Sequence, residues 1–234
     1  MKRATAAFLV ACIGLVPFAS RAGSSFDVGR VKVVLAEDGW EATEDKRDNL
    51  SLAINSGTIG VGPSVPGNVR VLSLHGANRQ PLAVLLIRTT YGASGNIRMG
   101  GDCSPIKGLY VNDLTKGRKG QPECIIAGGL YKGETVVDRA MERLKAFRET
   151  ATIDVPEKAI YVNGYFAINS GALIQVQALV APEFKGLEQG QPGAELPDKF
   201  PPQVAAWGDN LGLAIRKALN SIGGELRMPP FEFR

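Results

Sequence analysis

Histidine, cysteine and aromatic residues are all scarce in this chain of 234 residues. There is one histidine, His75, and there are three cysteines; aromatic side chains make up 7% of the sequence. With a single histidine, any Ser-His-Asp or Cys-His catalytic arrangement would have to pass through His75. We interpret His75 as a side chain at the edge of the turn that begins at Gly76, and we predict no catalytic residues.

Long hydrophobic runs are absent after the first 22 residues, so no later segment reaches the roughly 20 apolar residues that span a bilayer. The first segment has the parts of a signal peptide. These parts are the positive Met1-Lys2-Arg3, the apolar stretch from Ala4 to Phe18, and the small residues of Ser20-Arg21-Ala22. We expect cleavage after Ala22, which leaves residues 23–234 as a single domain in the periplasm or outside the cell.

A second interpretation of the leader rests on Leu9-Val10-Ala11-Cys12, which matches a lipobox. Acylation of Cys12 would anchor the protein to a membrane face. The residues after Cys12, Ile13 to Phe18, stay apolar, whereas a lipoprotein normally turns polar after its cysteine. We therefore favour simple cleavage and keep the lipid anchor as the alternative.

A strong excess of one charge is also absent. Three of the 27 basic residues lie in the leader, so cleavage leaves 24 basic against 23 acidic residues and a net charge of about +1. A nearly neutral protein has no electrostatic attraction to nucleic acid, and we expect no nucleic-acid partner.

Removal of the leader leaves two cysteines, Cys103 and Cys124. An even pair in an exported chain predicts a disulfide. No C-x-x-C spacing is present to lower a thiol pKa, so we interpret the bridge as structural and not redox-active. One histidine and two bridged cysteines cannot supply the usual nitrogen and sulfur ligands of zinc, and we expect neither a metal nor a cofactor.

Glycine and proline are plentiful, with 28 and 14 residues, which indicates many turns and short strands. Alternating or continuous apolar patterns predict strands along most of the chain. The expected strands are Val28–Leu35, Leu50–Ile54, a hairpin of Val69–Val71 with Pro81–Ile87, Leu109–Val111, Cys124–Ala127, a hairpin of Ala159–Ile168 with Ala172–Ala181, and an edge strand within Leu226–Phe233.

Two segments have the periodicity of helices. One runs from the capping residue Thr135 to Phe147. The other begins near Pro202 and presents an apolar stripe. That stripe consists of Val204, Trp207, Leu211, Ile215, Ala218 and Ile222. Together these elements predict an α+β fold, in which an antiparallel sheet of about six strands carries two main helices in one domain with one disulfide.

The order of these elements resembles that of PsbP/Mog1-type domains. In those domains an early strand ends in an aromatic residue, as at Asp38-Gly39-Trp40 here, hairpins follow, and a terminal helix covers the sheet. The chain is also similar to exported proteins of Gram-negative bacteria. Because such families share a scaffold and not one chemistry, the resemblance implies a fold but no catalytic residues.

Two short motifs match catalytic or phosphate-binding patterns only in part. Ser104-Pro105-Ile106-Lys107 matches S-x-x-K, but Gly108 follows it and no helix is predicted there. Gly57 to Gly62 resembles a phosphate loop, but no Gly-Lys-Ser/Thr follows and Pro63 and Pro66 prevent the required helix. We interpret both as turns.

Two groups of residues remain as candidate binding sites. The first is a polar and aromatic ligand platform on the second hairpin. It consists of Tyr161, Asn163 and Tyr165 on one strand with Gln175 and Gln177 on its partner. The second is a basic patch for an anionic partner, inside the disulfide loop. It consists of Lys116, Arg118 and Lys119.

These observations favour a secreted or periplasmic, non-catalytic envelope protein that binds an unidentified partner or ligand. One alternative is a secreted hydrolase that uses carboxylates near the disulfide loop, namely Asp102, Asp113 or Glu123. Such a mechanism requires two carboxylates facing each other across a cleft. The other alternative is a lipoprotein accessory factor anchored through Cys12.

Overall fold

The computed structural model describes residues 23–51, 64–90, 103, 110–115, 123–130, 154–156, 159–167, 172–181, 202–221 and 224–231. These residues form eleven strands, one 3-10 turn and one α-helix. In chain order they are β1 (Ser25–Val28), β2 (Val31–Val34), β3 (Trp40–Ala42), β4 (Lys46–Ser51), β5 (Ser64–His75), η1 (Ala77–Arg79), β6 (Pro81–Thr90), β7 (Tyr110–Asp113), β8 (Glu123–Leu130), β9 (Ala159–Ala167), β10 (Leu173–Val180), α2 (Pro202–Asn220) and β11 (Glu225–Arg227).

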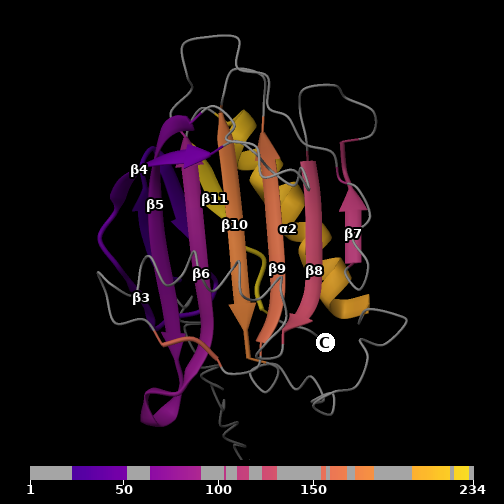
Figure 1. The fold of residues 1–234 in the computed structure, drawn as a ribbon. Coiled ribbons are helices and arrows are strands. Elements are labelled where there is room, and N and C mark those ends of the chain that lie inside the picture. The colour runs from indigo at the N-terminus through magenta and orange to yellow at the C-terminus, as the bar shows by residue number, and fades with distance from the viewer. Residues whose placement is uncertain are drawn as a thin grey trace, which may run out of the picture.

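The strands form a large sheet and a small one (Figure 1). The large sheet has the order β3-β5-β6-β10-β9-β8-β7, and all its pairs are antiparallel. β5 is long enough to pair with β4 along its first half and with β3 near its end. The small sheet has the order β1-β2-β11, with β11 parallel to β2.

Helix α2 and the small sheet cover the same face of the large sheet, behind it in the view of Figure 1. The helix lies against β8 and β9, where Gly164 has no side chain to hold it away. A Cβ atom at Gly164 would lie 3.0 Å from Leu211 and 3.1 Å from Ile215. The apolar stripe of α2 is thereby buried against the sheet.

Three aromatic side chains connect the chain's N-terminal and C-terminal parts. Phe231 is fully buried, with its ring centroid 5.7 Å from that of Trp40 and 4.9 Å from that of Trp207. The backbone N–H of Phe231 donates to Oε1 of Glu37 at 2.8 Å. Trp40, which follows the Asp38-Gly39 turn, is 6% exposed and belongs to the core.

The second face of the large sheet is buried as well. Most of its described apolar side chains have exposures of 4% or less, although Val111 of the edge strand β7 is half-buried. The buried side chains include Val69, Val71, Val84, Leu86, Ile126 and Leu179. A sheet covered on both faces has strands without a polar side. The continuous apolar run of β6 is explained in this way.

Both predicted hairpins are confirmed. β5 and β6 pair on either side of the Gly76–Gln80 turn, where the Gly76 N–H donates to the carbonyl of Gln80 at 2.8 Å. Asn78 and Arg79 adopt positive φ values of 60° and 57° to close this turn. β9 and β10 form the second hairpin.

The second predicted helix is confirmed as α2, whose buried residues include the predicted stripe from Val204 to Ala218. Ile222 lies outside the described residues, as does the predicted helix from Thr135 to Phe147. The predicted edge strand is confirmed as the short β11.

The predicted α+β class, with two main helices on a sheet of about six strands, is wrong. The described part of the chain is mostly β, with a three-stranded and an eight-stranded sheet and one helix. Several strands, including β3 and β11, have only three or four residues, too few for alternation to be recognised. The polar sequence of β4 concealed another strand.

The interpretation of Val28–Leu35 as one strand is also wrong. β1 and β2 form a hairpin there, in which Val28 pairs with Val31 around the turn at Gly29 and Arg30. Gly29 has φ of +59°, which glycine adopts without the steric cost of a side chain. The regular alternation on both sides of the turn had concealed the reversal.

Candidate functional site

The predicted disulfide between Cys103 and Cys124 is present, with a Cα–Cα distance of 5.6 Å. Cys124 is fully buried in β8, whereas Cys103 precedes β7 and lies in no strand. The bridge therefore fastens the segment before β7 to β8. The bridge therefore does not join two strands of the sheet.

The hydrogen bonds beside the bridge close the ends of β7 and β8. The backbone N–H of Glu123 donates to Oγ1 of Thr115 at 2.9 Å, and the N–H of Thr115 donates to Oδ1 of Asp113 at 2.8 Å. The N–H of Leu114 donates to the carbonyl of Glu123 at 2.9 Å. These contacts fix the two strand ends to each other.

Cys103, Cys124 and Asp113 bring two sulfur atoms and a carboxylate oxygen within 4.8 Å of one another. Thiolates bind metal only when they are free, and these two sulfurs are bonded to each other. The cluster is therefore a structural site in the bridged protein.

The carboxylates considered for a hydrolase do not face each other. Asp113 pairs with Cys124 in the β7–β8 register, so it lies on the face of Cys124, and the adjacent Glu123 lies on the opposite face. Asp113 is exposed, whereas the side chain of Glu123 is 1% exposed and lies against α2. Asp102 lies outside the described residues.

Glu123 is bound by Arg216 of α2. The Nε–H of Arg216 donates to Oε1 of Glu123 at 2.6 Å, and its Nη2 donates to the carbonyl of Leu114 at 3.4 Å. The hydrogen bond to Glu123 raises the pKa of Arg216, against the lowering effect of burial. The contact holds the C-terminal part of α2 on the β7–β8 edge.

A second polar contact joins α2 to this edge. Oδ1 of Asp209 accepts hydrogen bonds from Nδ2 of Asn112 at 2.7 Å and from the hydroxyl of Tyr110 at 3.3 Å. Burial raises the pKa of Tyr110 above 10, and the negative charge of Asp209 raises it further. Asp209 therefore favours the neutral phenol that donates to it.

His75 is the last residue of β5, beside the turn. Its Nδ1 lies 3.8 Å from Oε2 of Glu41, and Nη2 of Arg79 lies 3.2 Å from the same oxygen. Glu41 and Arg79 are mostly exposed, with side-chain exposures of 57% and 76%. This geometry agrees with a side chain at a turn edge.

The register brings the two halves of the predicted platform to one face. In the β9–β10 register, Tyr165 pairs with Gln175 and Asn163 pairs with Gln177. Gln175 and Gln177 are only 6% and 7% exposed. At these two glutamines the face is covered, and an open platform is not available there.

Several other candidates lie outside the described residues. These are Cys12, Gly57–Gly62, Ser104–Lys107, and the predicted basic patch of Lys116, Arg118 and Lys119. Their interpretation stays a prediction.

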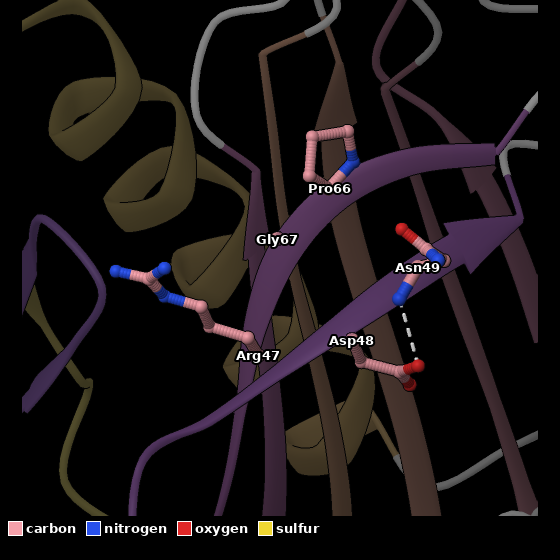
Figure 2. A pocket seen from close by; sticks show the side chains of 5 residues that line it. All are labelled: Arg47, Asp48, Asn49, Pro66 and Gly67. Atoms are coloured by element: carbon pink, nitrogen blue, oxygen red, sulfur yellow. Dashed lines mark hydrogen bonds between the residues drawn. The ribbon is translucent and has the colours of Figure 1, made fainter.

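A depression that the sequence did not reveal lies where β4 pairs with β5 (Figure 2). Its volume is about 520 Å³, and it is lined by Arg47, Asp48, Asn49, Pro66 and Gly67. The three β4 residues and Pro66 are exposed, and Gly67 is buried.

Strand alternation arranges these side chains. Arg47 and Asn49 are two residues apart, and they pair with Asn68 and Pro66, so they lie on one face with those partners. Asp48 lies on the other side of β4, and its Oδ1 accepts the backbone N–H of Asn49 at 2.7 Å. Figure 2 shows Arg47 and Asp48 pointing away from each other. Residues 46–49 are all charged or polar, so no apolar pattern in the sequence marked this part of the strand.

Comparison of the chain with known protein families, with characterised proteins and with solved structures finds no match in any of the three. In the described part of the chain, no helix combines the length and the apolar character that crossing a membrane requires. The functional conclusion therefore depends on the leader, the disulfide and the geometry described above.

Proposed function

We propose that the chain is exported, loses its first 22 residues, and acts as a disulfide-bonded protein that binds a partner of the cell envelope without catalysis. The positive start, apolar stretch and Ser20-Arg21-Ala22 site support export. The Cys103–Cys124 bridge supports it as well, because disulfides persist in oxidising compartments and are rare in the cytosol.

The observation that supports a non-catalytic function is that partly or fully buried polar side chains bind one another within the fold. Glu123 binds Arg216, Asp209 binds Asn112, and Asn68 donates through Nδ2 to Oδ2 of Asp45 at 2.7 Å. Each contact joins two elements of the fold. A carboxylate committed to a structural partner is poorly placed to exchange protons with a substrate.

The depression on β4 and β5 supports binding of a protein surface. Exposed polar residues line most of it, whereas small-molecule sites are enclosed and mostly apolar. The depression has a fixed position in the sheet, because β4 pairs with β5 and β5 pairs with β6.

Cell fractionation with chemical crosslinking tests the proposal. The full chain, expressed with a C-terminal tag in a Gram-negative host, should appear in the periplasmic fraction and form a discrete crosslinked product with an envelope protein. A Cys12→Ala variant should fractionate in the same way. Retention of the wild-type chain in the cytoplasm would contradict export, and the absence of any crosslinked partner would contradict the binding function.

A further inference from the structure

The arginines of the described residues differ in one respect. Six of the seven have interaction partners. Arg70 donates a hydrogen bond to the carbonyl of Thr43, and Arg79, Arg216 and Arg227 form ion pairs with Glu41, Glu123 and Glu225, respectively. Arg30 and Arg88 have interaction partners as well. Arg47 has no hydrogen bond, ion pair or ring contact within the described part of the chain. It is exposed and lines the depression shown in Figure 2. An unpaired guanidinium at the wall of an open depression is available to an anionic group from outside.

The edge of β4 does not favour addition of another strand. Pro66 has no N–H, and Asn49, which pairs with it, donates its own N–H to Oδ1 of Asp48. A new strand would need that N–H as a donor. Charged side chains on an edge strand also oppose pairing with a further strand. Recognition at this place therefore depends on side chains.

We propose that the depression receives the carboxylate of an aspartate or glutamate side chain on the protein partner, with Arg47 as its principal contact. The inference rests on the proposed binding function. A guanidinium presents N–H donors in a planar fork that matches a carboxylate. Asn49, on the same face as Arg47, presents an amide as a second donor. The side chain of Asp48, which also lines the depression, points away from Arg47, and its Oδ1 accepts the backbone N–H of Asn49.

The depression fits a protruding side chain because it is open to solvent. Pro66, on the same face as Arg47 and Asn49, supplies an apolar wall, whereas Gly67 lies on the face of Asp48, with which it pairs. The carboxylate chemistry is shared by free dicarboxylic acids and by acidic residues of a protein. A test must therefore compare a peptide with a free acid.

Nuclear magnetic resonance titration of the full chain, recovered as its host processes it, provides this test. The probes are an acidic Gly-Glu-Gly-Glu-Gly peptide, the same peptide with Gln in place of Glu, and free glutarate; both peptides have acetylated and amidated ends, so that they carry no terminal charge. The acidic peptide should shift the backbone signals of residues 47–49 and 66–67. Its dissociation constant should be about tenfold lower than that of the neutral peptide, as expected for one charge-assisted contact. Glutarate should bind more weakly than the acidic peptide.

Arg47→Gln should weaken binding of the acidic peptide about tenfold, whereas the matched variant Arg227→Gln, at another exposed arginine, should leave it unchanged. Equal binding of the acidic and neutral peptides would overturn the inference, as would unchanged binding by Arg47→Gln. Tighter binding of glutarate would assign the depression to a small acid instead.

The envelope crosslink separates this inference from the proposed function. If Arg47→Gln forms the crosslinked product as well as the wild type does, the carboxylate site is wrong and the binding function stands. If the wild type forms no such product, the binding function fails whatever the peptide titration shows.

Discussion

The guanidinium of Arg216 lies 2.6 Å from the carboxylate of Glu123, which is 93 residues earlier in the chain and only 1% exposed. This pair joins the single described helix to the start of β8, next to the disulfide. Leu114, at the end of β7, contributes its carbonyl to the same guanidinium. The position of the helix therefore depends on the contact between Arg216 and the buried carboxylate of Glu123.

Replacement of Arg216 by methionine should lower the free energy of unfolding by about 3 kcal/mol, because it leaves the buried carboxylate of Glu123 without its counter-ion. The partial exposure of Arg216, at 28%, places the effect at the lower end of the range for buried pairs. Urea denaturation measures the change.

The matched control is Arg227→Met, which breaks the surface pair with Glu225 and should cost less than about 1 kcal/mol. Equal losses for the two variants would show that the Glu123 carboxylate is satisfied by other groups.

The stability of the protein should decline in alkaline solution because of Tyr110. Burial and the charge of Asp209 raise its folded pKa above the unfolded value near 10. The native state therefore binds this proton more tightly than the unfolded state. The resulting stabilisation is complete below about pH 10 and is lost as the pH rises through the folded pKa.

Titration of tyrosinate absorbance checks this directly. Tyr110→Phe should remove a component that ionises above the ordinary pKa of tyrosine, and Asp209→Asn should move that component to lower pH. If Asp209→Asn leaves the titration unchanged, the carboxylate does not act on the phenol.

Two glycines of α2 should respond differently to alanine. At Gly208 an added Cβ would lie 2.7 Å from Cγ2 of Ile125, a methyl group on a β-branched carbon with little freedom to move. Gly208→Ala should therefore destabilise by about 1–2 kcal/mol, since overpacking exceeds the gain of about 1 kcal/mol in helix propensity.

At Gly212 the nearest atom, 2.6 Å away, is Cδ1 of Leu114, which is the far end of a flexible side chain. Gly212→Ala should be close to neutral, and Asn210→Ala, at an exposed position of the same helix, reports the propensity gain alone. Thermal unfolding measures the change in stability of the three alanine variants. A stabilised Gly208→Ala variant would contradict the close contact of α2 with β8.

Reduction of the disulfide should cost about 3 kcal/mol, given the separation of 21 residues between Cys103 and Cys124. Cys103→Ser should lose the same amount while keeping the buried sulfur of Cys124 in place. A dithiol reductant should then lower the urea midpoint of the wild type and leave that of Cys103→Ser unchanged. A wild type indifferent to the reductant would show that the bridge does not stabilise the fold.

Sequence patterns predicted the elements whose signals are long and local. The β5–β6 and β9–β10 hairpins have alternating or continuous apolar residues on both sides of glycine-containing turns, and α2 has five regularly spaced buried side chains. The even cysteine pair predicted the bridge. In each case the relevant residues lie near each other in the chain or have few alternative partners.

The remaining features arise from contacts between distant segments. The alternation from Val28 to Leu35 continues through the Gly29 turn, so periodicity alone could not distinguish one strand from two. Arg47 and Pro66 become neighbours of one depression through the β4–β5 register, which no local pattern specifies. The burial of Gln175 and Gln177 likewise depends on what covers the sheet face, not on their own strand.

Intact-mass measurement of the protein recovered from its host, followed by a non-reducing peptide map, tests the account most directly. The predicted result is a chain that starts at Gly23, with one peptide pair linked through Cys103 and Cys124 and no thiol that reacts with an alkylating reagent. A chain that retains Met1 and carries alkylated Cys103 and Cys124 would contradict it.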